Sequence, residues 1–240
     1  MFRQLIASLA MVLAVTSAGS LAHDARQDRA ATAASGLAST NYAFPLPEPG
    51  SYKLPPIKRA AGGRVLDESG RAFDLAGFFK GRVTVLAFIY TRCGDICPVA
   101  SLQLSLLQDL AATKHDVANQ IRLVSVSFDP EYDTPEVMAE HAANWRSKEP
   151  GAPDWQFLTA PDREAIAPIL AAYDQTIGPK RDPNSPTGPL HHIFRAFLVD
   201  ASGRIRNIYS LDFLDPRLVL NDIQTLLLEK HTNTNKRTAR

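Results

Sequence analysis

The chain of 240 residues carries 26 Lys and Arg against 25 Asp and Glu, so its formal net charge is only +1. A protein this close to neutral lacks the basic surface on which nucleic-acid binding depends, which excludes nucleic acid as an expected partner. The length is sufficient for one domain with a substantial core, and the sequence contains two cysteines.

Residues 1–22 have the pattern of a secretory signal peptide. A basic start at Arg3 is followed by an apolar run from Leu5 to Val15 and by small residues up to Ala22. This pattern predicts cleavage after Ala22 and export to the periplasm. The alternative is an uncleaved membrane anchor, although the run is short and diluted by Ser, Thr and Gly. No cysteine lies near the predicted cleavage site, which argues against a lipid anchor.

The next segment, 23–50, is predicted to be a disordered or extended linker. Its first part is rich in Ala, Asp, Arg, Ser and Thr without periodicity, and its last part is stiffened by prolines. A single domain is expected over residues 51–230. The polar, basic residues 231–240 are expected to form a flexible tail.

Within the predicted domain, strand and helix patterns alternate. The unbroken apolar run "VTVLAFIY" is typical of a strand that is buried on both faces. "PVASLQLSLLQDL" repeats apolar residues at Val99, Leu102, Leu106 and Leu110, which favours a helix. In chain order we expect a hairpin at 63–75, a strand at 83–90, a helix at 98–110, a strand at 121–128, helices at 134–145 and 161–173, the second kinked or split by Pro168, a hairpin at 194–200 and 204–209, and a helix at 215–230.

This order of elements predicts an α/β fold. Parallel central strands joined by crossover helices are covered by helices on both faces of the sheet. A thioredoxin-like α/β/α sandwich with an N-terminal β-hairpin extension has this order. Its reactive site lies in the loop between the first central strand and the following helix, which is "TRCGDIC" in this chain.

The two cysteines, Cys93 and Cys97, lie just after that strand and at the start of the next helix. The partial positive charge at a helix N-terminus favours thiolate over thiol. Positions four apart also place both sulfurs on the same side of one turn. Two such sulfurs form either a redox pair or half of a soft-metal site that selects Cu(I), Zn or an iron–sulfur cluster. Two are too few to hold an iron–sulfur cluster alone.

A third metal ligand would have to come from a histidine, and the residues themselves leave the choice open. The histidines nearest the termini fall in predicted tails, and His115 has a polar context that suits a surface residue. His141 lies on the apolar face of its predicted helix, which favours a packed core residue. His191 and His192 precede a strand and follow a proline-rich loop, and binding sites are often built on such loops.

Three stretches, in this order, resemble signatures of the Sco/SenC copper-binding proteins. "YTRCGDICP" is similar to the family's C-x-D-x-C-P pattern with three residues between the cysteines. "SFDPEYDTPEVMAEHA" resembles its D-P-x-x-D-T-P signature, and "HHIFRAFLVDASGRI" resembles its histidine followed by a strand that ends in Asp. Each stretch is a weak signal alone, but all three in order are specific. The resemblance covers roughly residues 50–230.

The resemblance implies that one copper ion, Cu(I) or Cu(II), is held by Cys93, Cys97 and one histidine. Counting back eight positions from the strand-ending Asp200 reaches His192, so His192 is the implied ligand and His191 the runner-up. Thiolates hold Cu(I) well, and the imidazole lets the same site accept Cu(II). When the metal is absent, the spacing still permits a disulfide.

Three acidic residues match the family signatures close to the implied site. Asp95 lies between the cysteines, where it is expected to make an outer hydrogen bond that orients a ligand. Asp129 and Asp133 match the second signature and are expected to cap the helix and shape the loop near the site.

The sequence departs from the family pattern at three places. Gly94 stands where the family often has proline, and Tyr132 stands where a basic residue is common. The stretch "GPKRDPNSPTGPLHH" is also longer and richer in proline than the family's usual segment before the histidine.

The resemblance implies a periplasmic metallochaperone rather than an enzyme. It would deliver copper to the binuclear copper site of a terminal oxidase, or reduce the thiols of that site. The implied partners are a copper-accepting oxidase subunit or another periplasmic cuproprotein, together with a thiol reductant. The alternatives are a thiol–disulfide oxidoreductase or thiol peroxidase with Cys93 and Cys97 as its redox-active pair, and a copper or redox sensor.

Overall fold

The structure, a computed structural model, describes residues 45–238, with side chains as far as residue 230. The predicted signal peptide and most of the predicted linker lie outside the described residues. Among the described residues, no helix combines the length and apolar character that crossing a membrane requires.

A six-stranded sheet in the order β1-β10-β9-β4-β5-β6 forms the centre of the domain. The pairs β4–β5 and β5–β6 are parallel, whereas β9 pairs antiparallel with both β4 and β10, and β1 pairs antiparallel with β10. The strands are β1 (Lys58–Arg59), β4 (Val83–Ile89), β5 (Ile121–Ser127), β6 (Asp154–Leu158), β9 (Ala196–Val199) and β10 (Arg204–Tyr209).

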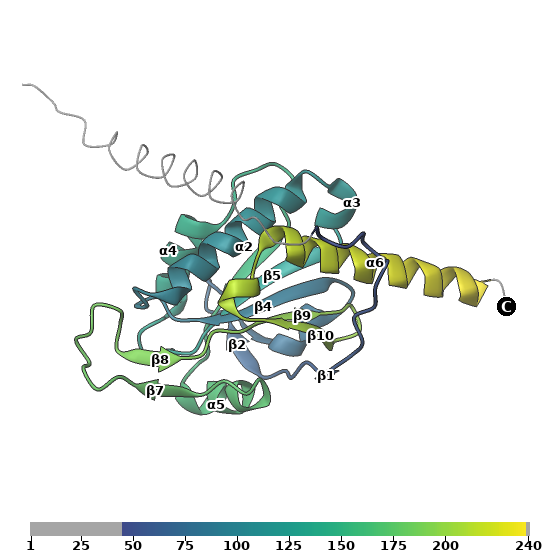
Figure 1. The fold of residues 1–240 in the computed structure, drawn as a ribbon. Helices are drawn as coiled ribbons and strands as arrows, with labels where there is room; N and C mark the ends of the chain where they lie inside the picture. The colour runs from purple at the N-terminus through teal and green to yellow at the C-terminus, as the bar shows by residue number, and fades with distance from the viewer. Residues whose placement is uncertain (1–44, 239–240) are drawn as a thin grey trace, which may run out of the picture. The chain divides into compact units, whose positions relative to one another are not determined.

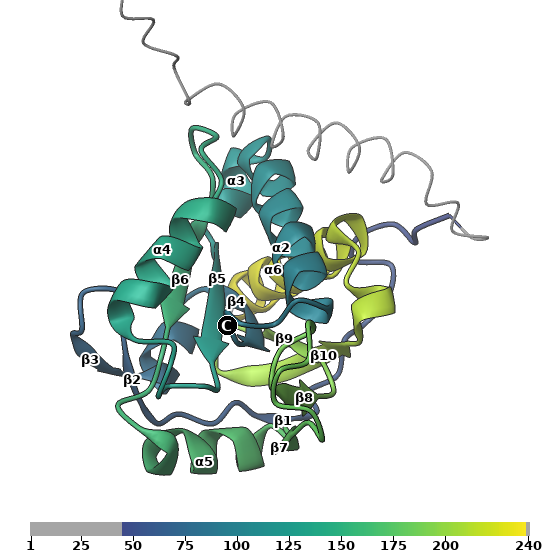
Figure 2. The same ribbon diagram turned by 90° about the vertical axis from the view of Figure 1, so that its left-hand side faces the viewer.

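Helices cover both faces of this sheet, and the two crossover helices between parallel strands lie on the same face (Figures 1 and 2). That face carries α2 (Ile96–Ala112), α4 (Pro135–Trp145) and α6 (Pro216–Thr238), while α5 (Arg163–Ala172) lies on the other. The remaining elements are the hairpin β2 (Arg64–Leu66) and β3 (Ala72–Asp74), the hairpin β7 (Ile177–Pro179) and β8 (Leu190–His192), the short α3 (His115–Ala118), and the 3-10 helices η1 (Leu75–Phe79) and η2 (Leu211–Phe213).

The core forms where apolar strands meet apolar helix faces. Every residue of β4 is buried, as the unbroken apolar run predicts for a strand between two layers. Helix α2 buries a stripe that includes Ala100, Leu104, Leu107 and Ala111, which recur at helical spacing. This stripe is offset from the repeat noted in the sequence, where Val99 is 45% exposed. Ala100 and Ala111 are both fully buried.

The predicted elements are found, but three features differ from the expectations. The sequence reading missed β6, a strand of only five residues in which Trp155, Phe157 and Leu158 are buried. Helix α5 is not split at Pro168 and runs through it. Helix α6 continues to Thr238 rather than ending at 230, because no proline or glycine interrupts the chain there.

The segment before His192, which was expected to be a loop, contains a β-hairpin. Strands β7 and β8 pair antiparallel, with Ile177 opposite His192 and Gly178 opposite His191. The proline-rich stretch is therefore the connection of a hairpin, and the two histidines lie in its second strand.

Candidate metal centre

The two cysteines lie where the first central strand gives way to its helix. Strand β4 ends at Ile89, and the chain turns through Cys93 before α2 begins at Ile96, so that Cys97 lies in the first helical turn. The Cys97 amide donates to Cys93 Sγ over 3.4 Å. Both residues are free thiols, and they are only 7% and 2% exposed. The two cysteines thus lie after a strand end and in a first helical turn, the positions that the local sequence pattern predicted.

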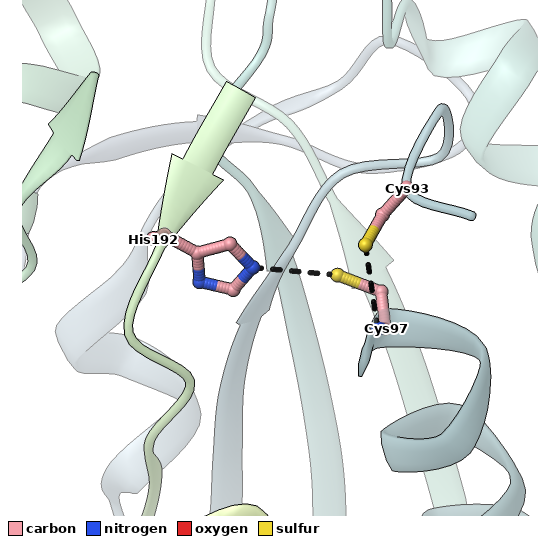
Figure 3. Close-up of side chains that lie close together, drawn as sticks. All are labelled: Cys93, Cys97 and His192. Atoms are coloured by element: carbon pink, nitrogen blue, oxygen red, sulfur yellow. Dashed lines mark hydrogen bonds between the residues drawn. The ribbon is translucent and has the colours of Figure 1, made fainter. Parts of the chain in front are cut away.

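His192 comes from the other side of the site, at the end of β8 (Figure 3). Its Nε2 lies 3.6 Å from Cys97 Sγ. One nitrogen of His192 and the sulfurs of Cys93 and Cys97 all lie within 4.8 Å of one another. Residues separated by 95 positions in the chain thus converge on one point.

His191 does not join this group. Side chains alternate along a strand, so neighbours on β8 point to opposite sides. The His191 side chain is exposed and packs over Gly178, with its Nε2 2.8 Å from the place that a Cβ there would occupy. The order of the two histidines matches the spacing that the resemblance implied.

Aromatic packing orients the His192 ring. Phe128 meets it edge to face with 4.7 Å between ring centroids, and Tyr90 does so at 6.1 Å. Its buried Nδ1 has no hydrogen-bond partner among the described residues. The ring position therefore depends on packing rather than on the outer hydrogen bond that metal-binding histidines usually make.

The pKa values of the two thiols are shifted in opposite directions. The hydrogen bond from Cys97, together with His192 and the amides of Cys97 and Asp95, lowers the pKa of Cys93 against the opposing effect of burial. The hydrogen bond to Cys93, burial and the charge on Cys93 together raise the pKa of Cys97. Cys93 is therefore the more easily ionised of the two thiols.

Asp133 lies beneath the cysteine loop and ties it to the end of β5. Its buried carboxylate accepts hydrogen bonds from the Thr91 amide at 3.0 Å, the Thr91 hydroxyl and the Ser127 hydroxyl. Burial raises its pKa despite these donors. This arrangement agrees with the predicted role in shaping the loop, whereas the predicted capping is wrong because the N-cap of α4 is Thr134. Asp133 is not among the three residues that converge.

Asp129 supports the same loop through Arg92. The guanidinium of Arg92 forms a 2.6 Å ion pair with the Asp129 carboxylate and lies 4.3 Å from the ring centroid of Tyr132. Tyr132, the departure noted in the sequence, thus stacks on the arginine that precedes Cys93. Asp95 is the N-cap residue of α2, but its exposed side chain makes no capping hydrogen bond within the described part of the chain.

The sequence reading missed Tyr90 as a residue of this site. Its hydroxyl donates to the carbonyl of Leu190 over 2.8 Å, which joins the end of β4 to β8 two residues before His192. Burial, followed by the charge on Cys93, raises the pKa of Tyr90 to about 12. No local pattern could have revealed a contact across 100 positions.

The other candidate histidines lie elsewhere in the fold. His115 is exposed at the start of α3, as its polar context predicted. His141 is half-buried and packs against Trp145 and Phe157, with ring centroids 6.2 and 5.8 Å away.

The donor set fits one soft metal ion. Ligand atoms within 4.8 Å of one another surround a space of the right size, since metal–sulfur and metal–nitrogen bonds are about 2.0–2.3 Å for a comparable ion such as Zn²⁺. Two sulfurs and an imidazole suit copper or zinc, whereas Mg²⁺ and Ca²⁺ require oxygen ligands.

The fold and this site define a thioredoxin-like α/β protein with a Cys-Cys-His cluster at the end of its first central strand. The SCO1/SenC family profile matches residues 64–228, which is more than half of the chain. The chain belongs to the SCO1/SenC family, and the resemblance seen in its sequence is confirmed.

Relatives of known name agree with this assignment. An SCO2-like protein of Rickettsia felis is 27% identical over 150 residues, which cover 62% of this chain and 67% of the relative. The structure of Bradyrhizobium japonicum ScoI with copper bound matches with a TM-score of 0.56 at 23% identity, covering 70% of this chain and 99% of that one. Yeast Sco1 with copper bound matches with a TM-score of 0.58 at 17% identity, covering 70% and 87%. At these identities the solved structures show the shared fold, and the predicted thioredoxin-like class is confirmed.

Proposed function

We propose that this protein holds one copper ion through Cys93, Cys97 and His192 and delivers it to the binuclear copper site of a terminal oxidase. The observation that carries the proposal is the convergence of two thiols and one imidazole in a chain of the SCO1/SenC family. The solved structures of Bradyrhizobium japonicum ScoI and yeast Sco1, which share this fold, have copper bound.

The chemistry of the three ligands suits transfer. Copper is cargo here rather than a resident cofactor, so the site must both bind and release it. Two thiolates favour Cu(I), and the imidazole extends the site to Cu(II). Three protein ligands leave a coordination position open, through which a ligand of the acceptor can enter before the first one leaves.

The choice between adjacent histidines provides the first test. His192→Ala should weaken Cu(II) binding by at least about a hundredfold, more than is usual for loss of an outer partner of a ligand. Cu(I) binding should fall less, because both thiolates remain. The Cu(II) spin-resonance spectrum should lose its nitrogen coupling in this variant.

His191→Ala is the matched control, because it removes the same ring from the opposite side of β8. It should leave the nitrogen coupling and both affinities close to those of the wild type. A spectrum that loses nitrogen in His191→Ala and keeps it in His192→Ala would overturn the ligand assignment.

The place of action in this proposal is the periplasm, supported by the signal-peptide pattern of residues 1–22. The acceptor is then a copper-accepting oxidase subunit, with another periplasmic cuproprotein as the alternative. Mass spectrometry of the exported protein should find a mature chain that begins near His23. An intact Met1 in the membrane fraction would contradict the cleavage.

A second candidate is reduction of the acceptor's thiols before copper arrives. The lowered pKa of Cys93, beside a second thiol that can resolve a mixed disulfide, favours this role. The two activities leave different products. A reductase without copper converts the acceptor's disulfide to two thiols and ends with a Cys93–Cys97 disulfide, whereas a copper donor loses one copper to an already reduced acceptor. Measuring both products with the same acceptor domain separates the two roles.

A further inference from the structure

The β7–β8 connection lies directly against the cysteine loop. The carbonyl oxygen of Pro186 is 2.6 Å from the position that a Cβ on Gly94 would occupy. On the other side of Cys93, a Cβ on Gly188 would overlap the Arg92 carbonyl oxygen. Residues 185–188, called the covering turn below, thus contact the backbone immediately before and after Cys93.

The covering turn is held by a defined set of hydrogen bonds. The Gly188 amide donates to the Ser185 carbonyl over 2.8 Å and closes the turn, and Gly188 has the left-handed φ of +88° that favours glycine. Lys180 Nζ donates to the carbonyl and hydroxyl oxygens of Thr187 at 3.0 and 2.6 Å. The Tyr90 hydroxyl reaches the Thr187 carbonyl at 3.3 Å.

These contacts lie next to Cys93, one of the two thiols of the site. Cys93 is 7% exposed, although its neighbours Arg92 and Gly94 are exposed residues at the surface. The same connection leads into β8, which ends at His192. A displacement of the covering turn would therefore affect both the access to Cys93 and the placement of the imidazole.

We propose that the covering turn shields Cys93 and positions His192, and that Gly94 is the residue that allows the turn to lie there. Gly94 and the long proline-rich connection are two departures from the family pattern, and in this proposal they contact each other. The part concerning His192 rests on the proposed copper site, whereas the shielding of Cys93 does not.

The physical basis is a close approach of two backbones. With no Cβ, Gly94 lets a carbonyl oxygen come nearer than any other residue would. Any side chain at this position forces the turn outward. The backbone of the connection is restricted by Pro183, Pro186 and Pro189. We therefore expect the whole turn to move away from residue 94 rather than to change its local conformation.

The test of shielding uses the reduced, metal-free protein. Gly94→Ala should raise the rate at which a bulky aromatic disulfide reagent modifies Cys93 by on the order of tenfold, the scale of an overpacked contact. The rate with a small alkylating reagent should rise less. A change in the thiol pKa alone would move both rates together, so the ratio of the two rates reports access.

Gly77→Ala is the matched control, because a Cβ there has no heavy atom within 4 Å. It should leave both rates at the wild-type values. If Gly94→Ala folds poorly, Tyr90→Phe gives a second approach, since it removes the hydrogen bonds to Thr187 and Leu190 without adding an atom against the turn. Tyr90→Phe should also raise the ratio of the bulky-reagent rate to the small-reagent rate. An unchanged ratio in the folded variants would overturn the proposal that the turn shields Cys93.

A shortened connection identifies the partner of Gly94. Replacing residues 181–188 by an Asn-Gly hairpin turn removes the covering turn and keeps the β7–β8 pairing. The bulky reagent should then react faster than in the wild type, and adding Gly94→Ala should cause no further increase. A full additional increase would show that Gly94 acts through some other contact.

Cu(II) loading tests the positioning of His192. The nitrogen coupling in the spin-resonance spectrum should weaken in Gly94→Ala and stay intact in Gly77→Ala. If the coupling is unchanged in Gly94→Ala while the reagent ratio rises, the turn does not position His192, although it does shield Cys93. If the wild type itself binds no copper, the proposed function fails, while the reagent ratio still decides whether the turn covers Cys93.

Discussion

Replacing either Cys93 or Cys97 with serine is expected to abolish tight Cu(I) binding. A serine hydroxyl does not ionise near neutral pH and is a hard oxygen donor, so each variant keeps one soft thiolate and one imidazole. We expect the affinity to fall by at least about a thousandfold, or about 4 kcal/mol at 1.4 kcal/mol per tenfold. Competition with a coloured Cu(I) chelator without oxygen measures this loss.

His191→Ala serves as the control for this experiment, because its exposed ring lies outside the cluster. The serine variants should keep the fold, since serine closely matches the shape of cysteine. Thermal unfolding of the metal-free proteins checks that point. Retention of one full equivalent of copper at wild-type affinity by either serine variant would refute the two-thiolate site.

His141→Leu is expected to reduce the loss of stability in acid. Burial lowers the pKa of His141 to about 4, from an ordinary value of 6.5. Between these values the unfolded chain binds a proton that the folded chain does not, so the free energy of unfolding falls as the pH falls from 6.5 to 4. A shift of about 2.5 units, at 1.36 kcal/mol per unit, makes this loss about 3 kcal/mol.

The measurement is urea unfolding at pH 7 and pH 4. The difference in unfolding free energy between these two conditions should be smaller in His141→Leu than in the wild type by about 3 kcal/mol. His115→Gln, at an exposed position of α3, should leave the difference unchanged. If the difference is equal in His141→Leu and the wild type, another group causes the loss of unfolding free energy in acid.

His141 also illustrates how far a periodic pattern can be trusted. Its place on the apolar side of α4 predicted burial, and the ring does pack against Trp145 and Phe157. The pattern could not predict that its buried Nε2 would lack a hydrogen-bond partner among the described residues. Hydrogen-bond partners come from other elements, and the sequence of one helix does not specify how those elements pack against it.

Elements with a strong local signal were predicted, and elements with a weak one were not. The buried strands β4 and β5 have long runs of apolar residues, so their sequence indicates both type and place. Strand β6, with five residues, and β7 and β8, with three each, were missed because strands this short show no recognisable period. The equally short β2 and β3 were predicted only as parts of a hairpin. Pairing with neighbours, rather than propensity, makes these segments strands.

The sequence by itself indicated that Cys93 and Cys97 lie close together, because only three residues separate them between a strand end and a first helical turn. It also indicated His192 through a resemblance in spacing. Only the tertiary structure decided that His192 rather than His191 faces the thiols, since the β7–β8 register sets which side each ring takes. The contact of Gly94 with Pro186, like those of Tyr90 with Leu190 and Asp133 with Thr91, joins residues distant in the chain. Such contacts arise only when separate elements pack, because no local pattern specifies which distant backbone will come within reach.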